Sequence, residues 1–161
     1  MSNAAMALRQ DDASELSCVV IPVAGRQLLL PNVCVAEIMP WRRIKTVKDR
    51  AEWCMGYLAW RGQTIPVLNF AGFDAQPVSI QSGRCMIVMN RARNSTGPAF
   101  YALVAEGLPR MVQLTDEDLV SSDATLGPAD VMCIKVGTED VTIPDLGFLE
   151  RNVAALQTIS G

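Results

Sequence analysis

The apolar residues of this chain are divided into many short segments, bounded by glycine, proline or charged residues. None approaches the roughly 20 apolar residues that a membrane-spanning helix needs. Short segments at close spacing are typical of β-strands, and they predict a mainly β fold built of small barrels or a sandwich. The expected strands cover residues 17–24, 26–30, 41–47, 56–60, 63–68, 84–90, 98–105, 110–114, 131–136 and 141–143.

One helix is expected, at the C-terminus. Apolar residues recur there at helical spacing, at Leu146, Leu149, Val153 and Leu156. Asp145 stands just before them as a helix cap, and the polar residues 150–152 occupy positions between the apolar ones. We therefore expect this helix to lay one apolar face on the strands.

The composition favours a single folded domain. Half of the 161 residues are hydrophobic and 19% are charged, so a substantial core can form. Residues 1–15 are small, polar and aperiodic, and we expect them to be a disordered tail or residues left from expression. Residues 16–161 are expected to form one domain of two lobes, because the segment 64–70 is echoed by 142–148 and the segment 35–37 by 104–106.

The residue types argue against an enzyme. The chain has no histidine, which excludes Ser-His-Asp and Cys-His catalysis, and it has no glycine-rich phosphate-binding loop. The acidic run 116–118 reads first as a turn of helix capped by Thr115, and only second as a carboxylate pair for catalysis. We therefore predict a protein without catalytic residues, metal or cofactor.

The cysteines indicate a reducing compartment. Five are present and widely spaced, with no C-x-x-C pair, which argues against both a disulfide framework and a zinc site. They are expected to be reduced and to behave as small hydrophobic residues. The start of the chain shows no secretory signal, so a cytoplasmic location is expected. The cysteines are Cys18, Cys34, Cys54, Cys85 and Cys133.

Charge is unevenly distributed along the chain. Residues 42–50 are basic, whereas residues 106–145 are mainly acidic. These regions are either two solvated faces or a pair of complementary contact surfaces. Nucleic acid is not expected as a partner, because the sequence pI is about 4.9 and aromatic residues are not interleaved with the basic ones.

The segment 56–70, GYLAWRGQTIPVLNF, resembles the signature of CheW-like domains, in which an Arg-Gly pair precedes Pro-Val at fixed spacing. Upstream, residues 28–38 resemble the family's strand that leads into V-x-E-I. Downstream, residues 104–108 resemble its V-D-G-V element. The resemblance extends over about residues 16–156. The chain departs from the family pattern at Trp60, where a smaller aliphatic residue is usual, and at Asn69 and Glu106, which replace aspartates.

The resemblance implies two small five-stranded β-barrel lobes that face each other across an apolar groove, with a C-terminal helix. It also implies a non-enzymatic adaptor of bacterial chemosensory signalling. Its partners would be a CheA-type histidine kinase and the cytoplasmic tip of a methyl-accepting chemoreceptor, with no insertion into the membrane. The departures suggest an auxiliary member, from a system that controls pilus-based twitching motility.

Seven residues are candidates for partner binding. Arg61 is expected at a tight turn, where Gly62 can adopt positive φ and project the guanidinium outward. The alternative for Arg61 is that it fastens the turn internally, and Glu37 has the same two interpretations. The aliphatic candidates either line the groove or belong to the core. The full set is Val33, Val35, Glu37, Ile38, Arg61, Gly62 and Val104.

An alternative function is a small β-barrel module that binds a nucleotide or an oligosaccharide. The chain has only nine aromatic residues, three Trp, two Tyr and four Phe, which supplies a stacking platform poorly.

Overall fold

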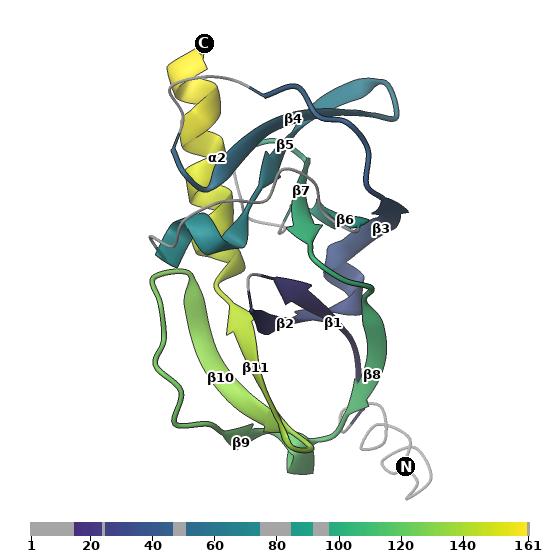
Figure 1. Cartoon of the computed structure of the whole chain (residues 1–161), viewed down its shortest axis with the longest axis vertical. Coiled ribbons are helices and arrows are strands. Elements are labelled where there is room, and N and C mark those ends of the chain that lie inside the picture. The colour runs from purple at the N-terminus through teal and green to yellow at the C-terminus, as the bar shows by residue number, and fades with distance from the viewer. Residues whose placement is uncertain (1–14, 24, 47–50, 75–84, 92–96, 161) are drawn as a thin grey trace, which may run out of the picture.

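The computed structural model describes residues 15–23, 25–46, 51–74, 85–91 and 97–160, without the side chains of 157–160. Two β-sheets make up two lobes, which are stacked along the long axis of the molecule, and one long helix runs beside the upper lobe (Figure 1). The predicted mainly β fold, its two lobes and the C-terminal helix are confirmed. The predicted tail, apart from residue 15, lies outside the described residues.

Lobe A is a six-stranded sheet that takes strands from both ends of the chain, in the order β8-β1-β2-β11-β10-β9. All its pairings are antiparallel except β11 with β2. The short β9 was not expected from the sequence. The strands are β1 (Leu16–Val23), β2 (Arg26–Pro31), β8 (Arg110–Leu114), β9 (Val120–Ser121), β10 (Asp130–Val136) and β11 (Glu139–Pro144).

Lobe B is a five-stranded sheet in the order β3-β6-β7-β5-β4. Two short 3-10 helices flank its strands, η1 (Asn32–Cys34) before β3 and η2 (Phe70–Asp74) after β5, and η3 (Asp116–Asp118) follows β8 of lobe A. The strands are β3 (Val35–Pro40), β4 (Cys54–Trp60), β5 (Gln63–Leu68), β6 (Cys85–Asn90) and β7 (Phe100–Ala105).

Neither sheet is closed into a barrel by pairing between its edge strands, as far as the described residues show. In lobe B the chain after β3 covers the open edge instead. Lys45 and Tyr57 exchange backbone hydrogen bonds of 2.8 and 2.9 Å, and Arg42 donates to the carbonyl of Ala59 at 2.7 Å. The described part of the segment predicted as a strand, residues 41–46, is therefore not a regular strand but forms an isolated bridge to β4 at Lys45. The regular strand lies earlier, at Val35–Pro40. Residue 47 lies outside the described residues.

A glycine allows this bridge to lie so close to β4. Gly56 adopts a φ of 148°, and a Cβ built on it would lie 2.2 Å from the carbonyl oxygen of Lys45. Any larger residue would push the bridging segment away from the strand. The first glycine of the 56–70 segment is thus explained by close backbone approach.

The central strands are buried on both faces. Along β1, Val19 and Ile21 face a core that the two lobes share, whereas Cys18 and Val20 face the interior of lobe A. Strands β6 and β7 alternate in the same way between the shared core and the interior of lobe B. Each lobe interior is occupied by apolar side chains, which speaks against a nucleotide or sugar bound inside a barrel.

The C-terminal helix α2 (Leu146–Ser160) seals the shared core. Asp145 caps it as predicted, since its Oδ1 accepts a hydrogen bond from the backbone N–H of Phe148 at 3.0 Å. Leu149 and Val153 are fully buried. Glu150, predicted among the polar positions, is also buried, and Tyr101 donates its hydroxyl to Glu150 Oε2 at 3.2 Å. Burial, reinforced by Glu150, raises the pKa of Tyr101 and keeps this donor protonated.

Removing α2 is expected to unfold the protein. A chain ending before Asp145 loses Leu149 and Val153 from the shared core, each worth roughly 1.5–3 kcal/mol, against a total stability of about 5–15 kcal/mol. The measurement is a circular-dichroism melt, with a chain ending after Gln157 as the control. A truncated chain that stays soluble and melts at the temperature of the control would show that the helix is dispensable.

Candidate functional site

The turn between β4 and β5 presents the best-defined candidate side chain. Trp60 pairs with Gln63, so Arg61 and Gly62 form a two-residue hairpin turn with φ values of 46° and 78°. Positive φ at both central positions is typical of a type I′ turn. The positive φ of Gly62 was predicted, whereas that of Arg61 was not. An arginine in this region is unfavourable on its own and is held here by contacts of its side chain.

Those contacts lead to Glu37 on β3. Arg61 Nη2 lies 3.2 Å from Glu37 Oε1, and the indole Nε1 of Trp60 donates to the same oxygen at 2.9 Å. Strands β3 and β4 are the two edges of the lobe B sheet, so this carboxylate joins the edges through side chains. A register shift between Val35 and Glu37 accompanies the arrangement and places Glu37 opposite Val88, whose side chain belongs to the lobe B interior.

Arg61 is both anchored and exposed. Its guanidinium carbon lies 4.9 Å from the centroid of the Trp60 ring, and that ring packs against Phe100 at 4.8 Å. The Arg61 side chain nevertheless keeps 68% of its surface exposed, and that of Glu37 keeps 36%. The two interpretations of Arg61 therefore coexist, because it fastens the turn and still presents N–H donors to solvent.

The aliphatic candidates separate into three groups. Val33 on η1 is 82% exposed, and Asn90 Nδ2 donates to its carbonyl at 3.2 Å. Val35 and Ile38 pair with Met89 and Ile87, so they lie on the face of β3 that is turned toward the shared core, where Ile38 remains 42% exposed. Val104 is buried in the lobe B interior, and the structure does not bring it to the surface.

Sequence reasoning missed the part that Trp60 plays. Trp60 was noted only as a departure from the family pattern, yet its buried indole N–H needs an acceptor and finds one in Glu37. The signal available in the sequence was a large polar-tipped residue directly beside the Arg-Gly turn. Arg42, which bonds the free edge of β4, was likewise not singled out.

The two lobes differ in exposed charge among the residues that the structure describes. The bridging segment of lobe B exposes Arg42, Arg43 and Lys45, while Lys48 and Arg50 lie outside the described residues. Lobe A exposes mainly acidic residues, two of which, Glu139 and Asp140, are paired with the exposed Arg110 and Lys135. The exposed acidic residues are Asp116, Glu117, Asp123, Glu139 and Asp140. The predicted Thr115 cap is confirmed, with a capping box in which Asp118 Oδ2 accepts the Thr115 backbone N–H at 2.7 Å.

No group of three or more potential metal ligands occurs among the described residues. None of the five cysteines forms a disulfide, four of them are buried, and burial raises the pKa of Cys18 and of Cys34. A raised pKa lowers the thiolate fraction and hence the reactivity of both thiols. None of the described helices is long and apolar enough to cross a membrane.

Comparison with known proteins gives one family and one fold. Residues 17–146 match the family described as the CheW-like domain. Among solved structures, the scaffolding protein TtCheW from Thermoanaerobacter tengcongensis is similar, with a TM-score of 0.68 and 17% sequence identity over 83% of this chain and 86% of that one. A search of curated proteins gives no significant match.

Glu37 is expected to stabilise lobe B through Trp60. Glu37→Ala leaves the buried indole N–H without this acceptor and should lower the free energy of unfolding by about 1–3 kcal/mol, whereas Glu37→Gln keeps an acceptor oxygen and should cost less. Urea denaturation followed by tryptophan fluorescence measures both. Glu139→Ala, on an exposed ion pair with Arg110, is the control. A Glu37→Ala protein as stable as this control would contradict the bridging role.

Proposed function

Because the chain belongs to the CheW-like domain family, we propose that it is a non-enzymatic adaptor that couples methyl-accepting chemoreceptors to a CheA-type histidine kinase. The observation that carries the proposal at the level of residues is the exposed, anchored Arg61 at the Arg-Gly turn. Such a group suits recognition, because its geometry is fixed before a partner arrives and little entropy is lost on binding.

The proposed contact surface follows the edge of lobe B. Arg61 and Glu37 supply a charged pair there, and Val33 and Ile38 supply exposed apolar surface on η1 and β3. An apolar centre with a polar rim is the composition of protein–protein interfaces in general. We assign this surface, with Val35 and Gly62, to the helical tip of the receptor. A separate surface would dock on the regulatory domain of the kinase.

The name of the similar solved structure supports a scaffold rather than an enzyme, since that protein is described as a scaffolding protein. The residues point the same way: the chain has no histidine for proton transfer. Five cysteines without a disulfide are compatible with the reducing cytoplasm, where we place the protein. We propose that neither a cofactor nor a nucleic acid takes part.

We extend the proposal to an auxiliary adaptor of a system for twitching motility. Three departures from the family pattern support it: Trp60, Asn69 and Glu106. The first two alter buried positions. Trp60 fills the lobe B interior, and Asn69 is buried with its Oδ1 accepting the Ala71 N–H at 3.0 Å. Glu106 is exposed and alters the surface that a partner would meet.

Reversing the charge at Arg61 is expected to weaken receptor binding. Arg61→Glu removes the charge-assisted hydrogen bond proposed between Arg61 and the receptor, and it adds repulsion between the new carboxylate and the receptor group that Arg61 would bind. Together these changes should cost about 2–5 kcal/mol of binding free energy. The melting temperature should fall by a moderate amount, because the lost ion pair is exposed and contributes about 0–1 kcal/mol, while the new carboxylate lies near Glu37. A calorimetric titration with a chemoreceptor tip hairpin, paired with circular-dichroism melts, separates binding from folding.

Arg43→Glu provides the matched control for this experiment. It makes the same change of net charge at an exposed position of the bridging segment. If both variants weakened receptor binding equally, Arg61 would contribute only through the overall charge of the protein and not through a specific contact. Full binding by an intact Arg61→Glu protein would remove Arg61 from the interface altogether.

A further inference from the structure

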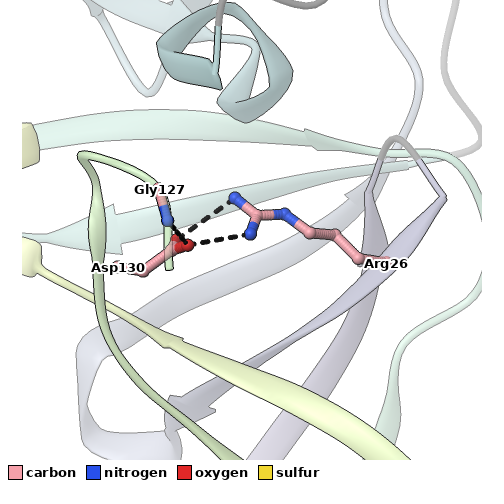
Figure 2. Close-up of polar contacts among 3 residues, drawn as sticks. All are labelled: Arg26, Gly127 and Asp130. Carbon is pink, nitrogen blue, oxygen red and sulfur yellow. Dashed lines mark hydrogen bonds and ion pairs between the residues drawn. The ribbon is translucent and has the colours of Figure 1, made fainter. Parts of the chain in front are cut away.

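Arg26 on β2 forms an ion pair with a buried partner. Its Nη1 and Nη2 lie 3.0 and 3.1 Å from the two carboxylate oxygens of Asp130, at the start of β10 (Figure 2). The Asp130 side chain is fully buried and that of Arg26 is 25% exposed. Asp130 Oδ2 also accepts the backbone N–H of Gly127 at 2.6 Å. The bidentate geometry and the extra donor satisfy a carboxylate that would be costly to bury alone.

The same guanidinium also contacts the other lobe. Its carbon lies 4.8 Å from the centroid of the Phe70 ring, within the range of a cation–π interaction. Phe70 begins η2, which is separated from the end of β5 by Asn69 alone, and is buried in the shared core. Arg26 and Asp130 both belong to lobe A. One arginine of lobe A is therefore held between a lobe A carboxylate and a lobe B aromatic ring.

Further contacts lead from Phe70 to the start of α2. Phe70 meets Phe73 edge-on at 6.0 Å, and Phe73 meets Phe148 of α2 edge-on at 5.4 Å. The N–H of Phe148 is bound by Asp145, as described above.

A backbone hydrogen bond completes the connection back to the ion pair. The N–H of Asp145 donates to the carbonyl of Ala129 at 2.7 Å, and Ala129 is the fully buried neighbour of Asp130. The contacts therefore form a closed circuit through lobe A, lobe B and the first turn of the helix.

We propose that Arg26 is a positioning residue that holds the two lobes and the N-terminus of α2 in one arrangement. The chain places an arginine here for a physical reason. Only a planar guanidinium offers two parallel N–H donors to a carboxylate and a flat face to an aromatic ring at the same time. A lysine would keep the charge opposite Asp130 but would lose the fork and the stacking face. This role concerns the arrangement of the fold and holds whatever partner the adaptor binds.

The test is hydrogen exchange, residue by residue, on the full chain with Arg26→Lys. Three backbone N–H groups donate the hydrogen bonds of the circuit: those of Gly127, Asp145 and Phe148. We expect their exchange to become roughly tenfold faster or more, because they open locally when the circuit is broken. Amides in the centres of β1 and β6 should change less than about twofold. Arg110→Lys, a matched change in an exposed ion pair of lobe A, should leave all of these amides unchanged.

A second variant separates positioning from overall stability. The double variant Arg26→Leu with Asp130→Leu removes both charges, so no carboxylate is left buried and unpaired. Replacing a buried ion pair with apolar residues often leaves the free energy of unfolding unchanged or higher. The melting temperature should stay close to that of the native chain, while Gly127 still loses its acceptor and the same three amides exchange faster. Uniformly faster exchange across both lobes would make Arg26 a general stabiliser and overturn the proposal. Native exchange at the three amides in both variants would overturn it as well.

Discussion

Burial of the central strands on both faces is the constraint on which the rest of the structure depends. Strands β1, β2, β6 and β7 each send alternate residues into the core that the two lobes share and into a lobe interior. Neither sheet could keep this arrangement alone, because one face of its central strands would then be exposed to water. The lobes and α2 therefore depend on one another for burial, although the described residues show no strand of one sheet paired with a strand of the other. The N–H of Glu106, just after β7, donates to the carbonyl of Pro22 on β1 at 2.8 Å. Surfaces on different lobes can consequently act at a fixed spacing, which an adaptor requires.

The same constraint pushes the candidate site to the edges of lobe B. Central strands have no free face, so exposed, chemically distinctive side chains occur where the sheet ends, on β3 and β4. An open edge is a liability in a soluble protein. Here the bridging segment covers part of β4, and Glu37 ties Trp60 and Arg61 to the opposite edge. The contacts that protect the edge are also the contacts that fix the proposed binding side chains.

Local rules made much of this fold predictable, and long-range geometry accounts for what was not. Most strands were predicted from short apolar segments, and α2 was predicted from the helical spacing of its apolar residues and from the cap at Asp145. Both kinds of signal lie in neighbouring residues of the sequence. The prediction placed a strand at 41–47, whereas the strand observed in this region is β3 at 35–40. The bridge between Lys45 and Tyr57 joins segments that are distant in sequence, so the local pattern does not reveal it. Glu37 and Arg61 were found by the family resemblance. Other features depend on how the strands and the helix pack against one another, which the local sequence does not show. They are the contact of Glu37 and Arg61 with Trp60, the burial of Val104 and of Glu150, and the Arg26 circuit.

An adaptor differs from a simple binding protein in holding two partners at once, and that property can be measured directly. Sedimentation velocity on a mixture of this chain, the regulatory domain of a CheA-type kinase and a chemoreceptor tip hairpin distinguishes the possible complexes. The proposed function predicts one faster-sedimenting species that contains all three proteins, because the lobes offer separate surfaces in a fixed arrangement. Competition, in which added receptor hairpin releases the kinase domain, would contradict it, as would a mixture in which this chain sediments alone.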